Sequence, residues 1–274
     1  MGVFYAAGEF INDEATMKKH GLTPGFKGKR IIVQGFGKVG YNAAKYIVAA
    51  GAKLVGVVEH DGSLYNSNGI DPEKLYRYRT HKQTISTYPI GDTYQNDEVL
   101  YKECDFLVTA ALDNVITKDN ANKINAKVVI EASNGPTTQI AEEILEKRNI
   151  LVLPDVLLSG GGLAVSYFEW LKNLDHMRPG QLSKRWEEKS KLKLINIIEE
   201  STKAKFDIDG KHSALLAGPR EEDIVHTALE DVMSSAAKEV KKVAEEKKIS
   251  LRLASFVYAI ERIDLAYREA GITI

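Results

Sequence analysis

Three glycines within one hexapeptide form the segment of this chain with the clearest chemical meaning. The hexapeptide Gly35-Phe36-Gly37-Lys38-Val39-Gly40 fits the pattern G-x-G-x-x-G, which binds the pyrophosphate of a dinucleotide when it joins a strand to a helix. In such a loop Gly35 permits the tight turn, Gly37 leaves the main chain open to phosphates, and Gly40 lets the helix pack closely. The alternative is a strand-loop-helix turn with incidental glycines.

An acidic residue completes the fingerprint. Glu59 lies 19 residues after Gly40 and directly follows Val57-Val58, where a carboxylate can bind the ribose hydroxyls of adenosine. An acid there disfavours the 2′-phosphate of NADP by charge repulsion, so we expect NAD as coenzyme, with NADP possible. His60 could accept that phosphate when protonated, although an exposed loop histidine is the simpler interpretation.

The sequence around the loop alternates between strand-like and helix-like segments. This alternation predicts an α/β fold, a Rossmann-like, doubly wound and mostly parallel sheet. The predicted strands are Arg30–Gln34, Lys53–Val58, Phe106–Thr109, Val128–Ile130 and Ile150–Leu153, and the predicted helices are Ala6–His20, Lys38–Ala50 and Thr138–Arg148.

Beyond Leu163 the strand-like runs stop and long helical patterns follow. The predicted helices are Ala164–Asn173, Leu182–Phe206, Glu221–Lys248 and Leu251–Ala270. We therefore expect a coenzyme-binding domain over residues 1–174, a helical excursion over 175–220, and C-terminal helices over 221–274 that pack back on the coenzyme domain. A disordered insert is the alternative for the excursion.

Composition and isolated residues exclude several other classes of protein. With 37 Lys+Arg against 38 Asp+Glu, the net charge of −1 argues against a nucleic-acid binder that works by bulk charge. The single cysteine, Cys104, cannot form an internal disulfide, and its acidic neighbours favour an inert packing thiol. No apolar run approaches the length of a membrane span, and the six histidines lack a zinc-binding pattern, so we expect no membrane association and no metal.

Three further segments carry a family resemblance. They are Glu59-His60-Asp61-Gly62-Ser63, Glu131-Ala132-Ser133-Asn134-Gly135-Pro136-Thr137-Thr138, and the stretch from Pro154 to Trp170. With them the chain resembles the coenzyme domain of the hexameric glutamate dehydrogenases of the antenna-bearing, animal type, over essentially all 274 residues. The resemblance implies L-glutamate and 2-oxoglutarate as substrates, a homo-oligomer (a trimer or hexamer at full length), and a mitochondrial matrix location, with the cytoplasm as the alternative.

The resemblance also implies roles for individual residues. The glycine loop would bind pyrophosphate and Glu59 the adenosine ribose. The remaining coenzyme residues would be Ala110, Ala111, Asn134 near the nicotinamide ribose, and Ser159, which stands where the family usually has asparagine. On the substrate side, Leu163 would pack on the methylenes of glutamate and Ser166 would contact its carboxylate. The alternative for Ser166 is a buried helix serine that bonds its own backbone.

The catalytic lysine and aspartate of the family belong to an N-terminal domain that this chain lacks, so no catalytic residue is assigned here. Two hypotheses remain: the coenzyme half of a glutamate dehydrogenase, and a stand-alone nucleotide-binding or regulatory module without turnover. A dehydrogenase of leucine or phenylalanine is a weaker third, because residues 175–220 resemble the family's antenna. The resemblance implies that GTP and ADP bind at the base of this antenna, near Lys172, His176 and His226. The equally good alternative is that these three residues are solvated charges at helix ends.

Overall fold

The computed structural model describes residues 1–82, 84–175, 181–203, 205 and 220–271. Its contacts divide the chain into two units. The first unit comprises Met1–Gly161 with Val232–Ile274, and the second comprises Gly162–Asp231. The first unit contains the whole β-sheet and every residue of the predicted coenzyme site, so the site is described within that unit alone.

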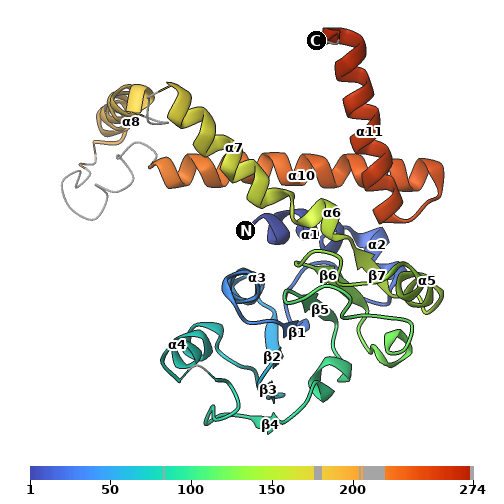
Figure 1. Ribbon diagram of the computed structural model, residues 1–274. Helices are drawn as coiled ribbons and strands as arrows, with labels where there is room; N and C mark the ends of the chain where they lie inside the picture. Colours follow the sequence, from blue (N-terminus) through green and yellow to red (C-terminus); the bar gives the residue numbers. More distant parts are fainter. Residues whose placement is uncertain (83, 176–180, 204, 206–219, 272–274) are drawn as a thin grey trace. The chain divides into compact units, whose positions relative to one another are not determined.

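A seven-stranded sheet forms the centre of the first unit, with the strand order β4-β3-β2-β1-β5-β6-β7 (Figure 1). Strands β2, β1, β5, β6 and β7 run parallel, and β3 and β4 add an antiparallel edge next to β2. The strands are β1 Arg30–Gln34, β2 Lys53–Glu59, β3 Gly62–Tyr65, β4 Asp92–Tyr94, β5 Phe106–Thr109, β6 Val128–Glu131 and β7 Leu151–Leu153. The strand order reverses beside β1, and in open α/β sheets ligands bind outside the carboxyl ends of the strands at such a switch point.

Alternate residues of the central strands face two separate hydrophobic layers. On one face Ile32, Leu107 and Val129 join a buried cluster with Ala141 and Leu145. The latter two residues belong to α5 (Gln139–Lys147), which therefore covers this face. On the other face Phe106 meets the ring of Phe26 at 5.9 Å between centroids, and Phe26 in turn stacks on Phe4. The sheet is thus covered on both sides, as continuous apolar strands require.

The helices of the first unit begin and end close to the predicted positions, with one correction. The predicted single helix Ala6–His20 is wrong: the segment forms α1 (Gly2–Ile11) and α2 (Glu14–Lys19). The break occurs because Asp13 has extended backbone and its carboxylate accepts the Thr16 amide at 2.8 Å, which caps a new helix. The remaining helices are α3 Lys38–Ala49, α4 Pro72–Lys82, the short α6 Asp155–Leu158, and α11 Leu251–Ala270.

Three elements between β2 and β5 were not predicted. Strands β3 and β4 and helix α4 lie there, with the 3-10 turn η1 (Glu98–Tyr101) after them. Both strands are short and hydrogen-bond only in antiparallel fashion at the sheet edge, where local sequence carries little apolar signal. Helix α4 escapes prediction because only Pro72 and Leu75 among its residues are buried, so its hydrophobic period is weak.

The second unit is mostly helical in its described part. It contains most of α7 (Gly160–Asp175), α8 (Gln181–Thr202) and the start of α10 (Glu221–Lys247), which continues into the first unit. The three predicted helices are present, but α7 begins at Gly160 and ends at Asp175 where Ala164–Asn173 was predicted. Helix α8 ends at Thr202, and the predicted end at Phe206 lies outside the described residues. Across the part of the chain that the structure describes, no helix is both long and apolar enough to cross a bilayer.

Candidate coenzyme site

The glycine loop joins β1 to α3, and the structure gives each of its glycines a measurable reason. Gly35 has a φ of +81°, which disfavours any side chain, and a Cβ there would lie 2.5 Å from the carbonyl oxygen of Ala110. A Cβ on Gly40 would lie 1.8 Å from the carbonyl oxygen of Gly35, so only glycine lets α3 approach the turn. These two predicted roles are confirmed.

Gly37 differs from its two neighbours because no atom lies within 4 Å of an added Cβ. A side chain on Gly37 would therefore point into open space. Gly37 is also the N-cap of α3, and no side chain caps this helix start. An uncapped helix start of this kind presents amide N–H groups and a partial positive charge. The arrangement can accept an anion from outside without moving protein atoms.

Two unpartnered polar atoms lie at the carboxyl ends of β1 and β5. Among the described residues, the Gln34 side-chain oxygen and the Thr109 hydroxyl are buried without a hydrogen-bond partner. The two residues are register partners across the β1–β5 pair, next to Gly35 and Ala110. Buried polar groups are almost always paired in folded proteins. Over the described ranges, the Thr137 hydroxyl is a third such atom, so the Gln34 and Thr109 pair is distinguished by its position at the strand switch point.

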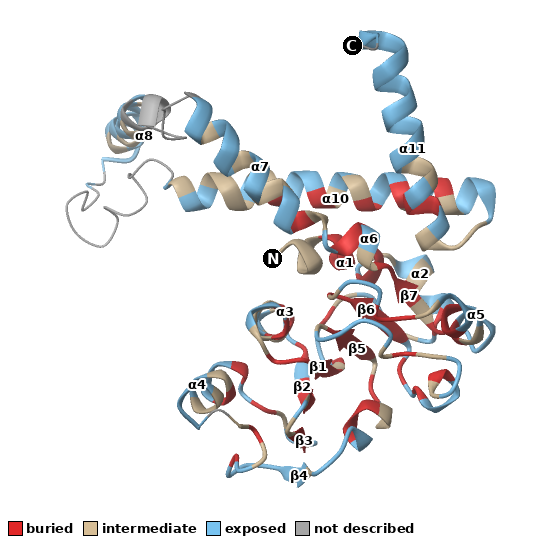
Figure 2. Cartoon of the chain, viewed as in Figure 1, coloured by how far each residue is buried: buried red, intermediate tan, exposed pale blue. Residues whose placement is uncertain are grey.

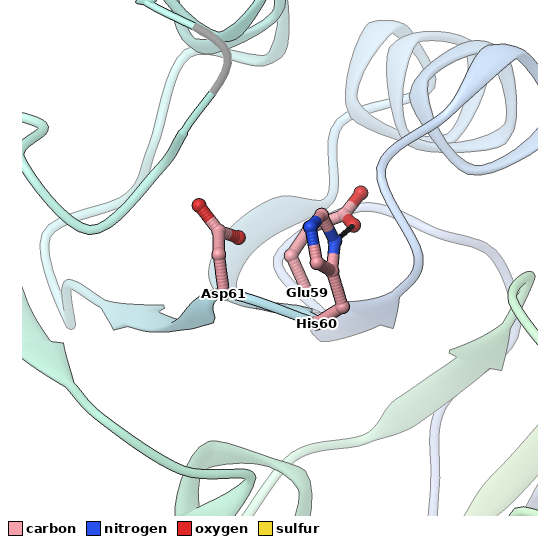
Figure 3. Close-up of side chains that lie close together, drawn as sticks. All are labelled: Glu59, His60 and Asp61. Atoms are coloured by element: carbon pink, nitrogen blue, oxygen red, sulfur yellow. Dashed lines mark hydrogen bonds and ion pairs between the residues drawn. The ribbon is translucent and has the colours of Figure 1, made fainter.

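The carboxylate of Glu59 is already engaged at the carboxyl end of β2. Its Oε1 accepts the Phe36 amide at 2.5 Å and lies 3.1 Å from Nη2 of Arg79, and the side chain is only 8% exposed. On the other oxygen, His60 Nδ1 lies 3.4 Å away, and Figure 3 draws this contact. The sequence predicted Glu59 but missed Arg79, which helix α4 supplies from 20 residues further along the chain. We name Glu59, the Phe36 amide, His60 and Arg79 the Glu59 cluster.

An aromatic stack holds α4 beside the glycine loop. The rings of Tyr41 and Tyr76 lie parallel with centroids 3.9 Å apart, and buried Phe36 meets both of them edge-on. Tyr41 follows the loop in α3, whereas Tyr76 precedes Arg79 by about one turn of α4. The stack therefore fixes the helix from which Arg79 reaches Glu59.

Consecutive side chains at this point also resemble a metal-ligand set. One potential ligand atom from each of Glu59, His60 and Asp61 lies within 4.8 Å of the others. In Figure 3 Asp61 stands apart from the hydrogen-bonded pair, and its carboxylate accepts the Ile85 amide at 3.2 Å. Because the Glu59 carboxylate is committed to a cation and an amide, we assign no metal to these residues.

The other predicted coenzyme residues follow the carboxyl ends of neighbouring strands. Ala110 and Ala111 follow β5, and the Ala110 amide donates to the carbonyl of Gln34 at 2.7 Å. Asn134 follows β6 and is exposed. Ser159 follows α6, where its hydroxyl bonds the carbonyl of Asp155 within its own turn. The glycine loop, Glu59, Ala110 and Asn134 thus follow the carboxyl ends of β1, β2, β5 and β6, whereas Ser159 lies beyond the short helix α6.

A charged network that the sequence did not indicate lies at the β6 and β7 side of the sheet. The guanidinium of Arg252, from the first turn of α11, bonds three carboxylates. Its Nη2 lies 2.8 and 2.7 Å from the two oxygens of Glu131, its Nη1 lies 2.6 Å from Asp155, and its Nε bonds Glu142. Glu131 is fully buried. We name these four residues the Arg252 cluster.

Burial and pairing act against one another within the Arg252 cluster. Burial raises the pKa of Glu131, and the charge of Arg252 offsets this only in part. For Asp155 burial also acts to raise the pKa, but hydrogen bonds from the Gly135 amide and from Arg252 outweigh it, and the pKa lies below the ordinary range. The guanidinium is itself desolvated, yet its carboxylate neighbours raise its pKa. Arg252 is therefore the fixed positive charge of this region.

The predicted substrate and effector residues belong to the second unit. Leu163 is 78% exposed on α7, and the hydroxyl of Ser166 bonds the Gly162 carbonyl one turn earlier at 3.0 Å. Lys172 pairs with Glu221, and His226 lies 3.9 Å from Glu222. His176 lies outside the described residues. Each described effector candidate thus has a carboxylate partner within its own unit.

Two features of the first unit lie away from the strand edge. Cys104 is buried, and burial followed by the charge of Asp105 raises the pKa of its thiol to about 12, in the predicted direction of an unreactive residue. A cavity of about 700 Å³ lies among α2, α10 and the start of α11, and none of the predicted coenzyme residues lines it.

The topology and the glycine loop together define a Rossmann-type, dinucleotide-binding class of α/β fold. The model of the glutamate/leucine/phenylalanine/valine dehydrogenase family matches residues 1–220, and the chain belongs to this family.

Within this family, the chain is similar to several proteins named glutamate dehydrogenase. The chain is 44% identical over 273 residues to the mitochondrial glutamate dehydrogenase of Dictyostelium discoideum, covering 99% of this chain and 54% of that protein. It is 37% identical over 253 residues to the glutamate dehydrogenase of Thermotoga maritima, covering 92% and 50%. The chain therefore spans about half the length of the curated relatives it matches.

Solved structures give the same proportions. The hetero-hexameric glutamate dehydrogenase of Thermus thermophilus, in a leucine-bound form, superimposes with a TM-score of 0.73 at 26% identity, covering 100% of this chain and 55% of that one. The glutamate dehydrogenase of Peptoniphilus asaccharolyticus gives a TM-score of 0.67 at 30% identity, covering 98% and 53%.

Proposed function

We propose that this chain is the coenzyme-binding portion of a glutamate dehydrogenase, which reversibly deaminates L-glutamate to 2-oxoglutarate and ammonia. The observation that carries the proposal is the glycine loop: Gly35 and Gly40 are sterically obligatory, whereas Gly37 opens onto free space at an uncapped helix start. Relatives that cover almost all of the chain bear the name glutamate dehydrogenase, which supports the choice of reaction.

The residues at the strand edge fit a dinucleotide. The loop amides would hold the pyrophosphate, Glu59 Oε2 would accept a ribose hydroxyl, and Ala110 and Ala111 would line the middle of the site. Asn134 would contact the nicotinamide ribose, with Ser159 beside it. When bound, the coenzyme accepts a hydride from the α-carbon of the amino acid. The unpartnered Gln34 and Thr109 atoms support the fit, because a polar ligand there would satisfy them.

For the coenzyme we propose NAD as the preferred form, with NADP also accepted. Glu59 is the acid that ordinarily rejects a 2′-phosphate, but the ion pair with Arg79 offsets its charge. An arginine close to the adenosine ribose is a common partner of that phosphate. His60, which is 80% exposed, is a second and weaker candidate.

The reaction also needs groups that no motif of this chain supplies. A lysine of lowered pKa that activates water and an aspartate that transfers protons would come from the rest of the full-length protein. On this chain we propose Leu163 and Ser166 as substrate contacts. Residues 175–220 would form an antenna that pairs between subunits of a homo-oligomer, with GTP or ADP bound near Lys172 and His226. A mitochondrial location is proposed by analogy with the Dictyostelium relative.

Binding of NADH to the 274-residue chain tests the proposal directly. We expect saturable enhancement of NADH fluorescence, and we expect Gly37→Val to raise the Kd at least about tenfold, because its side chain would fill the phosphate approach. Gly8→Ala is the matched control: its added Cβ meets only Asn12 Nδ2, at an ordinary 3.7 Å, so folding and binding should be unchanged.

Turnover is measured separately from binding. Glutamate-dependent reduction of NAD or NADP should be undetectable with this chain alone and should appear in the full-length protein. Binding that is equal in the wild type and in Gly37→Val, with both folded, would contradict the proposed site. Turnover by the chain alone would contradict the proposal that the catalytic lysine and aspartate lie in the other portion of the full-length protein.

A further inference from the structure

A side-chain hydrogen bond from Asp155 connects the Arg252 cluster to the loop on the predicted nicotinamide side of the site. Asp155 uses its two carboxylate oxygens differently: Oδ1 accepts Arg252 Nη1 at 2.6 Å, and Oδ2 accepts the backbone amide of Gly135 at 2.8 Å. Within the described part of the chain, the side chains of Glu131 and Glu142 bond Arg252 and the Asp155 amide but not residues 133–135. Asp155 is therefore the member of the cluster whose side chain links α11 to this loop by a hydrogen bond.

The loop that receives this bond is held in an unusual conformation. Gly135 has a φ of +54°, and its carbonyl accepts the Asn114 amide at 2.8 Å while its own amide donates to Asp155. Both the amide and the carbonyl of Gly135 are thus hydrogen-bonded. The exposed Asn134 immediately precedes this residue. The direction of Asn134 depends on the same peptide group that Asp155 holds.

Charge explains why Asp155 stays in place. Three carboxylates surround one guanidinium, and the side chains of Glu131, Glu142 and Asp155 are only 0%, 10% and 13% exposed. Without the cation, these carboxylates would repel one another in a poorly solvated place. The least buried of them, Asp155, could then turn away and release the Gly135 amide.

The attachment point of Arg252 belongs to the well-packed part of α11. Ser250 caps the helix with a bond from the Leu253 amide, and Ala254 and Ser255 are buried. Figure 2 shows the burial confined to this first part of the helix, with the remainder exposed. The cluster is thus anchored by a fixed helix start rather than by a free end.

We propose that Arg252, acting through Asp155, is a positioning residue that orients Asn134 and Gly135 toward the nicotinamide half of the coenzyme. This inference rests on the proposed function. It assigns the strand edge two independent supports: the glycine loop holds the pyrophosphate, and Arg252 with Asp155 sets the far half of the site.

The experiment compares two charge-neutralising variants of the same cluster. Asp155→Asn keeps the shape but leaves one acceptor oxygen for two donors, so it breaks one of the two bonds. Glu142→Gln is the matched control: it removes one charge from the same guanidinium but has no bond to the loop. Both variants are measured in the 274-residue chain. The probes are NADH and 5′-AMP. Because 5′-AMP lacks the nicotinamide half, it competes with NADH for the adenosine side alone.

We expect Asp155→Asn to raise the Kd of NADH about tenfold and the Ki of 5′-AMP by less than about twofold, whereas Glu142→Gln changes neither by more than about twofold. Arg252→Lys should reproduce the NADH-selective loss, because an ammonium cannot bridge three carboxylates. Equal weakening of NADH and 5′-AMP in Asp155→Asn would show a general structural effect and overturn the proposal, as would unchanged NADH binding.

A measurement without ligand covers the case in which these variants do not fold. In the wild type, the Gly135 amide should be protected from hydrogen exchange, and Glu142→Gln should preserve the protection. An unprotected Gly135 amide would overturn the proposal whatever the variants do. If the folded wild type binds neither NADH nor 5′-AMP, the proposed function fails. If the wild type binds both and Asp155→Asn leaves the ratio of their dissociation constants unchanged, only the positioning role of Arg252 and Asp155 fails.

Discussion

Two charged clusters stand at the same edge of the sheet and are built with opposite stoichiometry. In the Glu59 cluster one carboxylate is shared by Arg79, a backbone amide and an exposed histidine. In the Arg252 cluster one guanidinium is shared by three carboxylates, one of which is fully buried. The first cluster sets one arginine against one carboxylate, whereas the second sets one arginine against three.

This difference suggests different tasks for the two clusters. An arginine that is 29% exposed and shares a single carboxylate can change partner at small cost, which suits a position that meets either a hydroxyl or a phosphate. A guanidinium that alone neutralises a buried carboxylate cannot leave without a large penalty. We infer that the adenosine side adapts to its ligand, whereas the nicotinamide side is fixed by the protein.

The largest expected effect separates the two arginines by stability. Arg252→Met should lower the free energy of unfolding by about 3–5 kcal/mol, because it leaves a buried carboxylate unpaired. Arg79→Met should cost less than about 1 kcal/mol, since Glu59 keeps the Phe36 amide and Arg79 is partly solvated. Urea unfolding followed by circular dichroism measures both. Equal losses would erase the distinction between the clusters.

The pH dependence of the same variant sharpens this contrast. Because the pKa of Glu131 is raised in the folded chain, the folded chain binds more protons at this residue than the unfolded one. The contribution of Glu131 to stability therefore falls as the pH rises above 4.5, its unfolded pKa. Removing Arg252 raises that pKa further. The lowered pKa of Asp155 stabilises the fold above pH 3.8, and part of this gain also depends on Arg252.

The Asp155 contribution is already complete at pH 5, so between pH 5 and pH 8 the change in the deficit of the variant comes from Glu131. The stability deficit of Arg252→Met should be larger at pH 8 than at pH 5, measured as the difference between urea midpoints. A deficit that is independent of pH would show that Arg252 acts through packing of its side chain and not through the charges of its partners.

A smaller effect concerns coenzyme choice at the Glu59 cluster. Arg79→Met should raise the Kd of NADPH about tenfold more than that of NADH, because an unneutralised Glu59 repels the 2′-phosphate. Arg77→Met is the control: this residue lies on the same helix, is 74% exposed and pairs with Glu73. Parallel changes for both coenzymes would remove Arg79 from the choice between them.

The smallest effect is expected at His60. Its side chain is 80% exposed and its contact with Glu59, at 3.4 Å, is long. His60→Asn should therefore change the Kd of NADPH by less than about threefold, against about tenfold for Arg79→Met. A larger effect at His60 than at Arg79 would transfer the proposed phosphate contact from the helix to the loop.

The sequence predicted those parts of the fold whose signals are local. The strands β1 and β5 and the helix α11 have the predicted bounds, because a continuous apolar run or a regular helical period marks them. The split of α1 from α2 was missed although a signal was present: Asp13 is a favoured N-cap residue, and the acidic Glu14 follows it in the first turn. The edge strands β3 and β4 had no comparable signal, since their pairing is with each other and with β2.

What the sequence by itself determined is the phosphate loop with its acid, because glycine spacing and a strand-helix junction are properties of a few consecutive residues. Only the tertiary structure decided which charges surround that loop. Arg79 reaches Glu59 from a helix with little hydrophobic period, and Arg252 reaches Glu131 across 121 residues of chain. No local pattern encodes such a pair. Its partners meet because the sheet and its covering helices bring them together, and their charges matter because the same packing removes the water that would otherwise screen them.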